Sequence, residues 1–271
     1  MLNILPLLRC PVSHESLLAN NLGLVSEVSG CSFPVIRGRP VFLPPEVREN
    51  LVIKEDHVSN TLSKDITAKI NDTAGLVLNL SAGGTPVKSD NTIEVEYSIF
   101  RHTDIVADAH NLPFKDSVFS GIVCMNAFEH YRKPHLVAKE LYRILKPNGW
   151  LLVHTAFIQP VHEAPYHFFN CTKYGLGEWF HDFQDVTIDV SANFNPIYAL
   201  SWLLSELDLS CNAFGGAEAS EAFQKLSVAE IISFWRDSPS RDNVKWDLLK
   251  NLPQAAQEML AAGYQLTATK R

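Results

Sequence analysis

The pattern of apolar and polar positions divides the chain into regions of different character. Residues 1–45 contain short apolar runs between turn residues, such as "LGLVSEV", "FPVI" and "IRGRPVFLP". Short runs broken by Gly, Asn and Pro are typical of strands and tight turns, so this region is expected to be a small β-rich module. Residues 46–73 are polar and helix-compatible, and we expect a helical connector there.

Residues 74–271 show a different pattern, because apolar runs of strand length alternate with helical periodicity up to about residue 190. The expected strands are "GLVLNL", "NTIEVEY", "DIVADA", "SGIVCMNA" and "WLLVHTAF". Between the last two, residues 133–149 carry one apolar helical face, with Pro134 suited to the first turn and Asn148-Gly149 to the end. Apolar strands alternating with helices predict an α/β fold built on a parallel sheet.

The C-terminal part of this region is mostly helical in pattern. Residues from about 195 to 260 read as a helical insertion, which could serve as an acceptor lid or a homodimer surface. The final segment "GYQLTATKR" has the pattern of a last strand.

Composition narrows the classes of partner and compartment. The formal net charge of -7 argues against a protein that grips nucleic-acid phosphates. The five cysteines are few and scattered, which favours a reducing cytoplasm over a disulfide framework. No apolar run reaches the ~18 residues of a membrane span, and the N-terminus lacks the basic start of a signal peptide. We therefore expect a soluble cytoplasmic protein.

Residues 104–157 contain three motifs that occur together in one enzyme family. They are Asp108-Ala109-His110 followed by "LPF", then Phe119-Ser120 leading to Glu129-His130, and "RILKPNG" before a strand. This stretch resembles the class I S-adenosylmethionine (SAM)-dependent methyltransferases, in particular the type 11-like group. The resemblance implies a Rossmann-like sheet of seven strands, with "GYQLTATK" as the last, and SAM as cofactor.

The candidate cofactor residues lie where the predicted strands end. Ligands of such sheets bind beyond the carboxyl ends of the strands. By the resemblance, Glu96 binds the ribose, and Asp108 and Ala109 contact the adenine. The other candidates at this edge are Asn79, Ser81, Gly83, Met125, Asn126 and His130.

Each of these residues also has a simpler interpretation. Glu94 and Glu96 alternate with Ile93 and Val95, so either one could be a solvated strand residue, and Glu94 is the second candidate for the ribose. Asp108 could cap the following turn. His130 could be a core histidine.

The first loop departs from the family pattern "DxGxGxG". Asn79, Ser81, Gly83 and Thr85 occupy the aligned positions, and Ser81 fits there if its φ is negative. The next two strands begin so soon that both crossovers must be abbreviated, without full helices. A pseudo-methyltransferase that binds a partner without methyl transfer is therefore the alternative to an enzyme.

Residues 157–180 resemble a segment that follows the fifth strand in one methyltransferase subgroup. This implies that the segment covers the acceptor side. His162 is then the candidate catalytic residue, as a base or an orienting group. Thr172 is expected to be a helix N-cap.

The N-terminal module resembles the small zinc-ribbon-like domain that precedes some methyltransferases. Of the ligand positions, Cys10 and Cys31 remain, while Ser13 and Val28 occupy the other two. We expect a metal-free module held by apolar packing, with zinc on Cys10, His14 and Cys31 as the alternative.

The sequence thus predicts a SAM-dependent methyltransferase that acts on a small-molecule or a glycan- or lipid-linked acceptor. A similar layout occurs in some rRNA guanine methyltransferases, but the acidic charge and the missing cysteines favour the small-molecule class.

Overall fold

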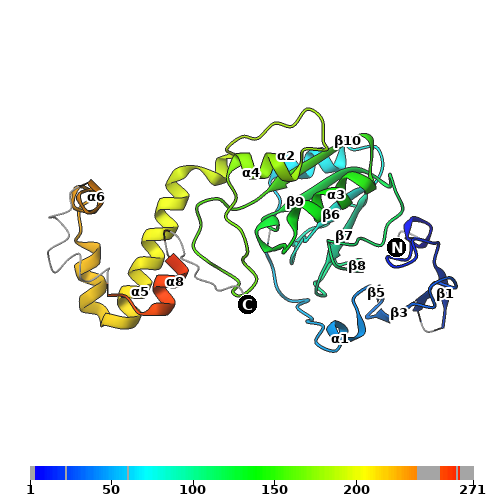
Figure 1. Ribbon diagram of the computed structural model, residues 1–271, viewed down its shortest axis with the longest axis horizontal. Helices are drawn as coiled ribbons and strands as arrows, with labels where there is room; N and C mark the ends of the chain where they lie inside the picture. The colour runs from blue at the N-terminus through cyan, green and yellow to red at the C-terminus, as the bar shows by residue number, and fades with distance from the viewer. Residues whose placement is uncertain (1–3, 22, 60, 237–250, 261, 263–271) are drawn as a thin grey trace, which may run out of the picture. The chain divides into compact units, whose positions relative to one another are not determined.

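The computed structural model describes residues 4–21, 23–59, 61–236, 251–260 and 262. The chain forms two compact units (Figure 1). Unit 1 comprises Met1–Ala156 and Phe168–Thr187, and unit 2 comprises Phe157–His167 and Ile188–Arg271. The predicted last strand over residues 263–271 lies outside the described residues.

The centre of unit 1 is a parallel sheet of five strands in the order β10-β9-β6-β7-β8. The bounds are β6 Val77–Leu80, β7 Thr92–Glu96, β8 Ile105–Val106, β9 Phe119–Met125 and β10 Leu145–His154. Every residue of β6, β7 and β8 is buried, including the polar residues Asn79, Thr92, Glu94 and Glu96. The predicted α/β fold with a parallel sheet is confirmed, with five strands among the described residues where seven were expected.

The strand order places a topological switch point between β6 and β9. From β6 the chain steps outward to β7 and β8, then returns to β9 on the other side of β6. Residues 81–91 and 97–104, all of which the structure describes, connect these strands without a helix. The expectation of abbreviated crossovers is therefore correct for this half of the sheet.

A helix does connect β9 to β10. The 3-10 helix η2 (Phe128–His130) is followed by α3 (Pro134–Ile144), which buries the predicted apolar face. The predicted end at Asn148-Gly149 is too late. Val118 N donates to Ile144 O (2.8 Å) and Leu145 pairs with Phe119, so the chain joins the sheet directly after Ile144.

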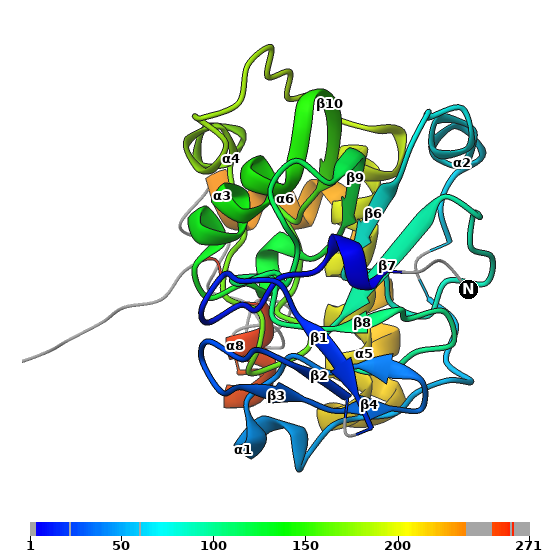
Figure 2. The same cartoon turned by 90° about the vertical axis from the view of Figure 1, so that its right-hand side faces the viewer.

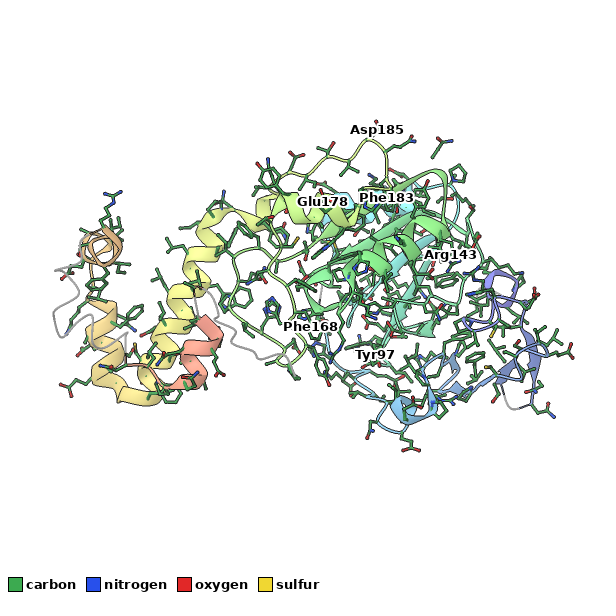
Figure 3. All side chains as sticks on the ribbon, viewed as in Figure 1. Tyr97, Arg143, Phe168, Glu178, Phe183 and Asp185 are labelled. Carbon is green, nitrogen blue, oxygen red and sulfur yellow. The ribbon has the colours of Figure 1, made fainter. Side chains whose placement is uncertain are left out.

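Arg143 of α3, labelled in Figure 3, forms hydrogen bonds that link two of the sequence motifs. Arg143 Nη1 donates to Phe114 O (2.6 Å) and Nη2 to Leu112 O (3.1 Å), the two ends of the "LPF" segment. The guanidinium also pairs with Glu140 (2.6 Å) and Asp116 (2.9 Å), and Glu140 accepts from Leu112 N (2.9 Å). The "LPF" and "RILKPNG" motifs are therefore two sides of one hydrogen-bonded structure.

The N-terminal part of unit 1 forms short strands apart from the main sheet (Figure 2). After η1 (Leu5–Leu7), strands β1 (Leu18–Asn20), β2 (Gly23–Val25) and β3 (Ser32–Phe33) pair antiparallel. Strands β4 (Val35–Ile36) and β5 (Arg39–Pro40) form a hairpin around Gly38, whose φ of +77° suits glycine.

Cys10 is surrounded by hydrogen-bonding groups from two turns. Its buried sulfur accepts from Val12 N and Ser13 N (both 3.4 Å) and lies 3.5 Å from Ser29 Oγ. Ser13 Oγ lies 3.0 Å from Ser26 Oγ. Ser26 and Ser29 therefore accompany Cys10 and Ser13, while Val28 is 71% exposed.

Hydrogen bonds also set the acidity of the Cys10 thiol. Burial raises its pKa, but the donors from Ser13, Ser29 and Val12 outweigh burial and lower the pKa to about 7. Two turns, residues 10–13 and 26–29, are closed in the same way. In each, the side chain of the first residue accepts from the backbone N of the fourth: Cys10 Sγ from Ser13 N, and Ser26 Oγ from Ser29 N (3.2 Å). A polar cluster therefore joins the turns, in addition to the apolar packing that we expected.

Among the described residues of the connector, helix occurs only near the two ends. Helix α1 covers Pro45–Arg48, and α2 covers Lys64–Asn71 with Ser63 as its N-cap. The prediction of a helical connector over residues 46–73 is wrong for the described residues between these helices. Ile53 forms a parallel bridge to Ile99, so backbone bonds to the sheet region replace those of a helix.

Helix α4 (Lys173–Trp179) belongs to unit 1, and its N-cap is Thr172, whose Oγ1 accepts from Gly175 N (3.1 Å) as predicted. Unit 2 contains η3 (Ala192–Phe194), α5 (Pro196–Gln224), α6 (Val228–Arg236) and α8 (Gln254–Leu260). Its core includes Cys211, Phe223, Leu252 and Ala256. None of the helices in the described part of the chain is long and apolar enough to cross a membrane.

Candidate active site

Ser81 and Tyr131 are bonded to each other at the switch point of the sheet. Ser81 follows β6 directly, and its Oγ shares a hydrogen bond of 2.8 Å with Tyr131 Oη. Tyr131 is 8% exposed and also lies 3.6 Å from Cys124 Sγ on β9. The φ of Ser81 is +51°, not negative as assumed from sequence, so the bond to Tyr131 helps hold a serine in a conformation that favours glycine.

Glu96 contacts the glycine loop that follows β6. Glu96 ends β7 and is 8% exposed. Its Oε1 accepts from Gly83 N, and its Oε2 accepts from Tyr97 N (3.2 Å). Burial raises the pKa of Glu96 to about 7, against the opposing effect of these two donors. A buried carboxylate with few donors is suited to a ligand that brings hydroxyl groups.

Glu94 and Asn79 lie deeper in the sheet. They pair in register across β7 and β6 and are 1% and 2% exposed, so neither is a solvated residue. Glu94 Oε1 accepts from Thr85 Oγ1 (2.7 Å), while Oε2 is buried without a hydrogen-bond partner. Burial raises the pKa of Glu94 as well. Glu94 therefore contacts Thr85, while Asn79 lies beside Glu94 within the sheet.

The raised pKa of Glu96 makes fold stability depend on pH. The folded state holds the proton more tightly than the unfolded state, so stability falls as pH rises from the ordinary 4.5 to about 7. Glu96→Gln removes this loss. Between pH 4.5 and 8, the free energy of unfolding of Glu96→Gln should therefore rise relative to wild type by up to about 3 kcal/mol. Urea unfolding at several pH values measures this difference, and parallel pH profiles for the two proteins would contradict it.

Asp108 and Ala109 follow β8 at the same edge. Ala107 N donates to Glu96 O (2.9 Å), which holds this segment against the end of β7. Asp108 Oδ1 accepts from His110 N (2.9 Å) and contacts His110 Nδ1 (2.6 Å). Burial raises the pKa of Asp108, but the contacts with His110 outweigh it, so the net pKa is lowered and the group is ionised. Its side chain is 50% exposed, which leaves it accessible to a ligand.

The end of β9 carries Met125, Asn126 and His130. Asn126 has a φ of +51°, and its N donates to His154 O (2.9 Å) at the end of β10. His130 ends η2, where it is half-buried. Its neighbour Glu129 is 1% exposed, with Oε2 accepting from Thr155 Oγ1 (3.0 Å).

His162 lies in unit 2. Its Nδ1 is 3.0 Å from Pro160 O, and its ring packs against His167 and Trp202, with centroids 4.2 and 5.5 Å away. Its assignment to catalysis stays a prediction.

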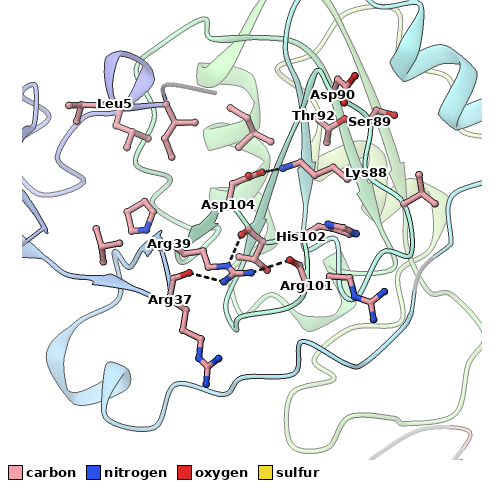
Figure 4. Close-up of a pocket in the computed structure, with 18 of the residues that line it drawn as sticks. Leu5, Arg37, Arg39, Lys88, Ser89, Asp90, Thr92, Arg101, His102 and Asp104 are labelled. Atoms are coloured by element: carbon pink, nitrogen blue, oxygen red, sulfur yellow. Dashed lines mark hydrogen bonds and ion pairs between the residues drawn. The ribbon is translucent and has the colours of Figure 1, made fainter. Parts of the chain in front are cut away.

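A cavity of about 1150 Å³ lies on another side of unit 1, near the N-terminal ends of β7 and β8 (Figure 4). Two of its cations are engaged within the protein: Lys88 pairs with Asp104, and Arg39 donates to the carbonyls of Arg37 (2.7 Å), Arg101 (3.0 Å) and Thr103 (3.1 Å). Because Thr92 begins β7 and Asp104 precedes β8, this cavity is separate from the carboxyl ends of the strands.

The structure thus brings Gly83 to Glu96 and sets Asp108 beside the end of β7. Sequence reasoning missed Tyr131 and Ser59, whose contacts with the loop span 50 and 25 residues. No local pattern marks contacts of that separation. The aromatic residue directly after Glu129-His130 was the one available signal for Tyr131.

Comparison with protein families gives a match over the same part of the chain. Residues 79–153 match the model of the methyltransferase domain family. The matched residues include every candidate cofactor residue from Asn79 to His130, together with β7 to β9 and α3. No curated protein matches the sequence.

Solved structures with similarity to the chain include a cyclase and two methyltransferases. The 4+2 cyclase SpnF is 23% identical over 44% of this chain and 55% of its own, with a TM-score of 0.36. A SAM-dependent methyltransferase from Thermotoga maritima is 20% identical over 42% and 66%, with a TM-score of 0.32. A phosphoethanolamine N-methyltransferase from Haemonchus contortus, in complex with S-adenosylhomocysteine, is 13% identical over 64% and 47%, with a TM-score of 0.37. The chain therefore spans from about half to two thirds of the length of these structures.

Proposed function

We propose that the protein is a SAM-dependent methyltransferase that binds its cofactor at the carboxyl ends of β6, β7, β8 and β9. One observation carries this proposal: the buried carboxylate of Glu96 lies beside Gly83, next to the switch point of a sheet whose sequence matches the methyltransferase domain family. Ligands of such sheets bind at this point.

The residues present fit the adenosine part of SAM. The Glu96 carboxylate can accept hydrogen bonds from both ribose hydroxyls, which would stabilise its ionised form in a buried position. Asp108 has one oxygen engaged by His110 and can accept from the adenine amino group with the other, while the Ala109 amide donates to the ring. Ser81 and Gly83, both with positive φ, let the backbone of the loop approach the ligand closely.

When bound, SAM supplies an electrophilic methyl group on a sulfonium. The protein then needs chiefly to align an acceptor with that methyl group and to exclude water. Met125, Asn126 and His130 line the β9 side of the proposed site, and we assign them to this positioning. His162 is the proposed base or orienting group for the acceptor.

The proposed acceptor is a small molecule or a glycan- or lipid-linked metabolite. The net charge of -7 disfavours nucleic acid as substrate. A cytoplasmic setting is part of the proposal and is supported by five cysteines that are all free. The helical insertion at about residues 195–260 is the proposed acceptor lid or homodimer surface.

Calorimetry with SAM and S-adenosylhomocysteine tests the cofactor. We expect the wild-type protein to bind both ligands with micromolar dissociation constants. Absence of binding of either ligand at millimolar concentration would overturn the proposal and leave the pseudo-methyltransferase as the surviving hypothesis.

A further inference from the structure

The loop between β6 and β7 receives its support from the connector rather than from a helix. Residues 81–91 are described throughout and contain no helix that could hold the loop after Gly83. Backbone amides and carbonyls in a buried loop need partners, so other segments must supply them.

Ser59 supplies both partners for Gly84. Gly84 N donates to Ser59 Oγ (2.9 Å), and Ser59 N donates to Gly84 O (2.8 Å). The connector backbone lies directly against this glycine, because a Cβ on Gly84 would be 2.0 Å from His57 O. Consecutive amides of the loop are thus held from two sides, Gly83 by Glu96 and Gly84 by Ser59.

The same segment is anchored beside β7 as well. Lys54 N donates to Ile99 O (2.8 Å), and Ile99 N donates to Val52 O (2.9 Å), three residues beyond the end of β7. Glu55 pairs with Arg39 (3.0 Å) on β5. Burial raises the pKa of Glu96, and the positive charge of Lys54 is one of the influences that lower it. Lys54 therefore interacts electrostatically with the Glu96 carboxylate.

From these contacts we propose that residues 52–59 are a positioning strap of the cofactor site, and that Ser59 positions the loop for the methionine end of SAM. This inference rests on the proposed function. The sheet order β8-β7-β6 places Asp108, Glu96 and the loop in that sequence along one edge. With adenine at Asp108 and ribose at Glu96, the loop meets the end of the cofactor that lies farthest from adenine.

Comparing the binding of two ligands distinguishes this positioning role from general structural support. SAM contains the amino-acid part of methionine, whereas 5′-methylthioadenosine has the adenosine part without it. We expect Ser59→Ala to weaken SAM binding about tenfold and to leave 5′-methylthioadenosine within twofold of wild type, since one hydrogen bond to the loop is lost. Ser59→Thr keeps the hydroxyl and should restore SAM affinity.

The matched control is Ser63→Ala, in the same connector. Ser63 Oγ accepts from Ile66 N (3.3 Å) and caps α2 without contacting the loop. This variant should lose stability while keeping the ratio of the two affinities. Equal weakening of both ligands by Ser59→Ala, or no weakening of either, would overturn the inference.

Amide hydrogen exchange gives a readout that needs no ligand. Ser59→Ala should speed exchange at Gly84 at least tenfold, whereas Ser63→Ala should affect only Lys64–Asn71. If the wild-type protein bound neither ligand, the proposed function would be wrong. If the exchange rate at Gly84 were unchanged in Ser59→Ala, the positioning role of residues 52–59 would be wrong, whatever the ligand binding.

Discussion

Glu96→Gln is expected to lower SAM affinity about 100-fold, which corresponds to about 2.7 kcal/mol. The substitution keeps the shape of the side chain and an acceptor for Gly83 N. It removes the negative charge, and the amide has one oxygen in place of two. Hydrogen bonds to a charged group contribute roughly 1.5–3 kcal/mol, so the weakening of two ribose contacts accounts for the effect. Titration calorimetry with SAM at pH 8, where wild-type Glu96 is mostly ionised, measures it.

Glu94→Gln is the matched control for this prediction. Glu94 is two residues earlier on the same strand, is also buried, and bonds to Thr85 instead of the loop amide. It should retain SAM affinity within a few-fold. If Glu94→Gln lost binding and Glu96→Gln did not, the ribose assignment would move to Glu94, the second candidate from the sequence.

Arg143→Met should lower the free energy of unfolding by about 3 kcal/mol. The guanidinium is 18% exposed and donates to the carbonyls of Leu112 and Phe114 as well as to Glu140 and Asp116. Met has a similar length but no donors, so two carbonyls and a largely buried Glu140 carboxylate lose their partner. Thermal and urea unfolding of the purified variant measure the loss.

Two further variants distinguish this effect from loss of charge alone. Arg143→Lys keeps the charge but lacks the planar set of donors, and should recover less than half of the loss. Arg37→Met removes an exposed arginine whose contact with Glu55 is 3.4 Å, and should cost under about 1 kcal/mol. A loss of under 1 kcal/mol for Arg143→Met would contradict the role of Arg143 as the link between the two motifs.

Local patterns in the sequence predicted much of the sheet. The buried strands β6, β7 and β9 coincide with apolar runs, and α3 begins at Pro134 as its pattern predicted. The sequence also predicted that Glu96 and Asp108 lie at one edge of the sheet. The carboxyl ends of parallel strands lie at the same edge, so residues at the end of each expected strand are brought there. These features depend on residues close together in the chain.

The details of the loop did not follow from the sequence. Ser81 was expected to need a negative φ, but it is held at +51° with its hydroxyl bonded to Tyr131, 50 residues away. We expected the connector to be helical. Instead, residues 52–59 lie against the segments that come after β6 and β7, because they form hydrogen bonds to Gly84 and Ile99. Near Cys10, the serines of a second turn form contacts that the sequence did not predict.

Local sequence patterns were enough to predict the parallel α/β sheet, its abbreviated crossovers and the edge where Glu96 ends β7 and Asp108 follows β8. Periodicity and strand-end position are local properties that each segment carries independently. How the glycine loop is held, by Glu96 on one side and Ser59 on the other, became clear only in the folded structure. That arrangement depends on backbone groups left without a helix, and their partners come from segments that meet only when the chain is folded.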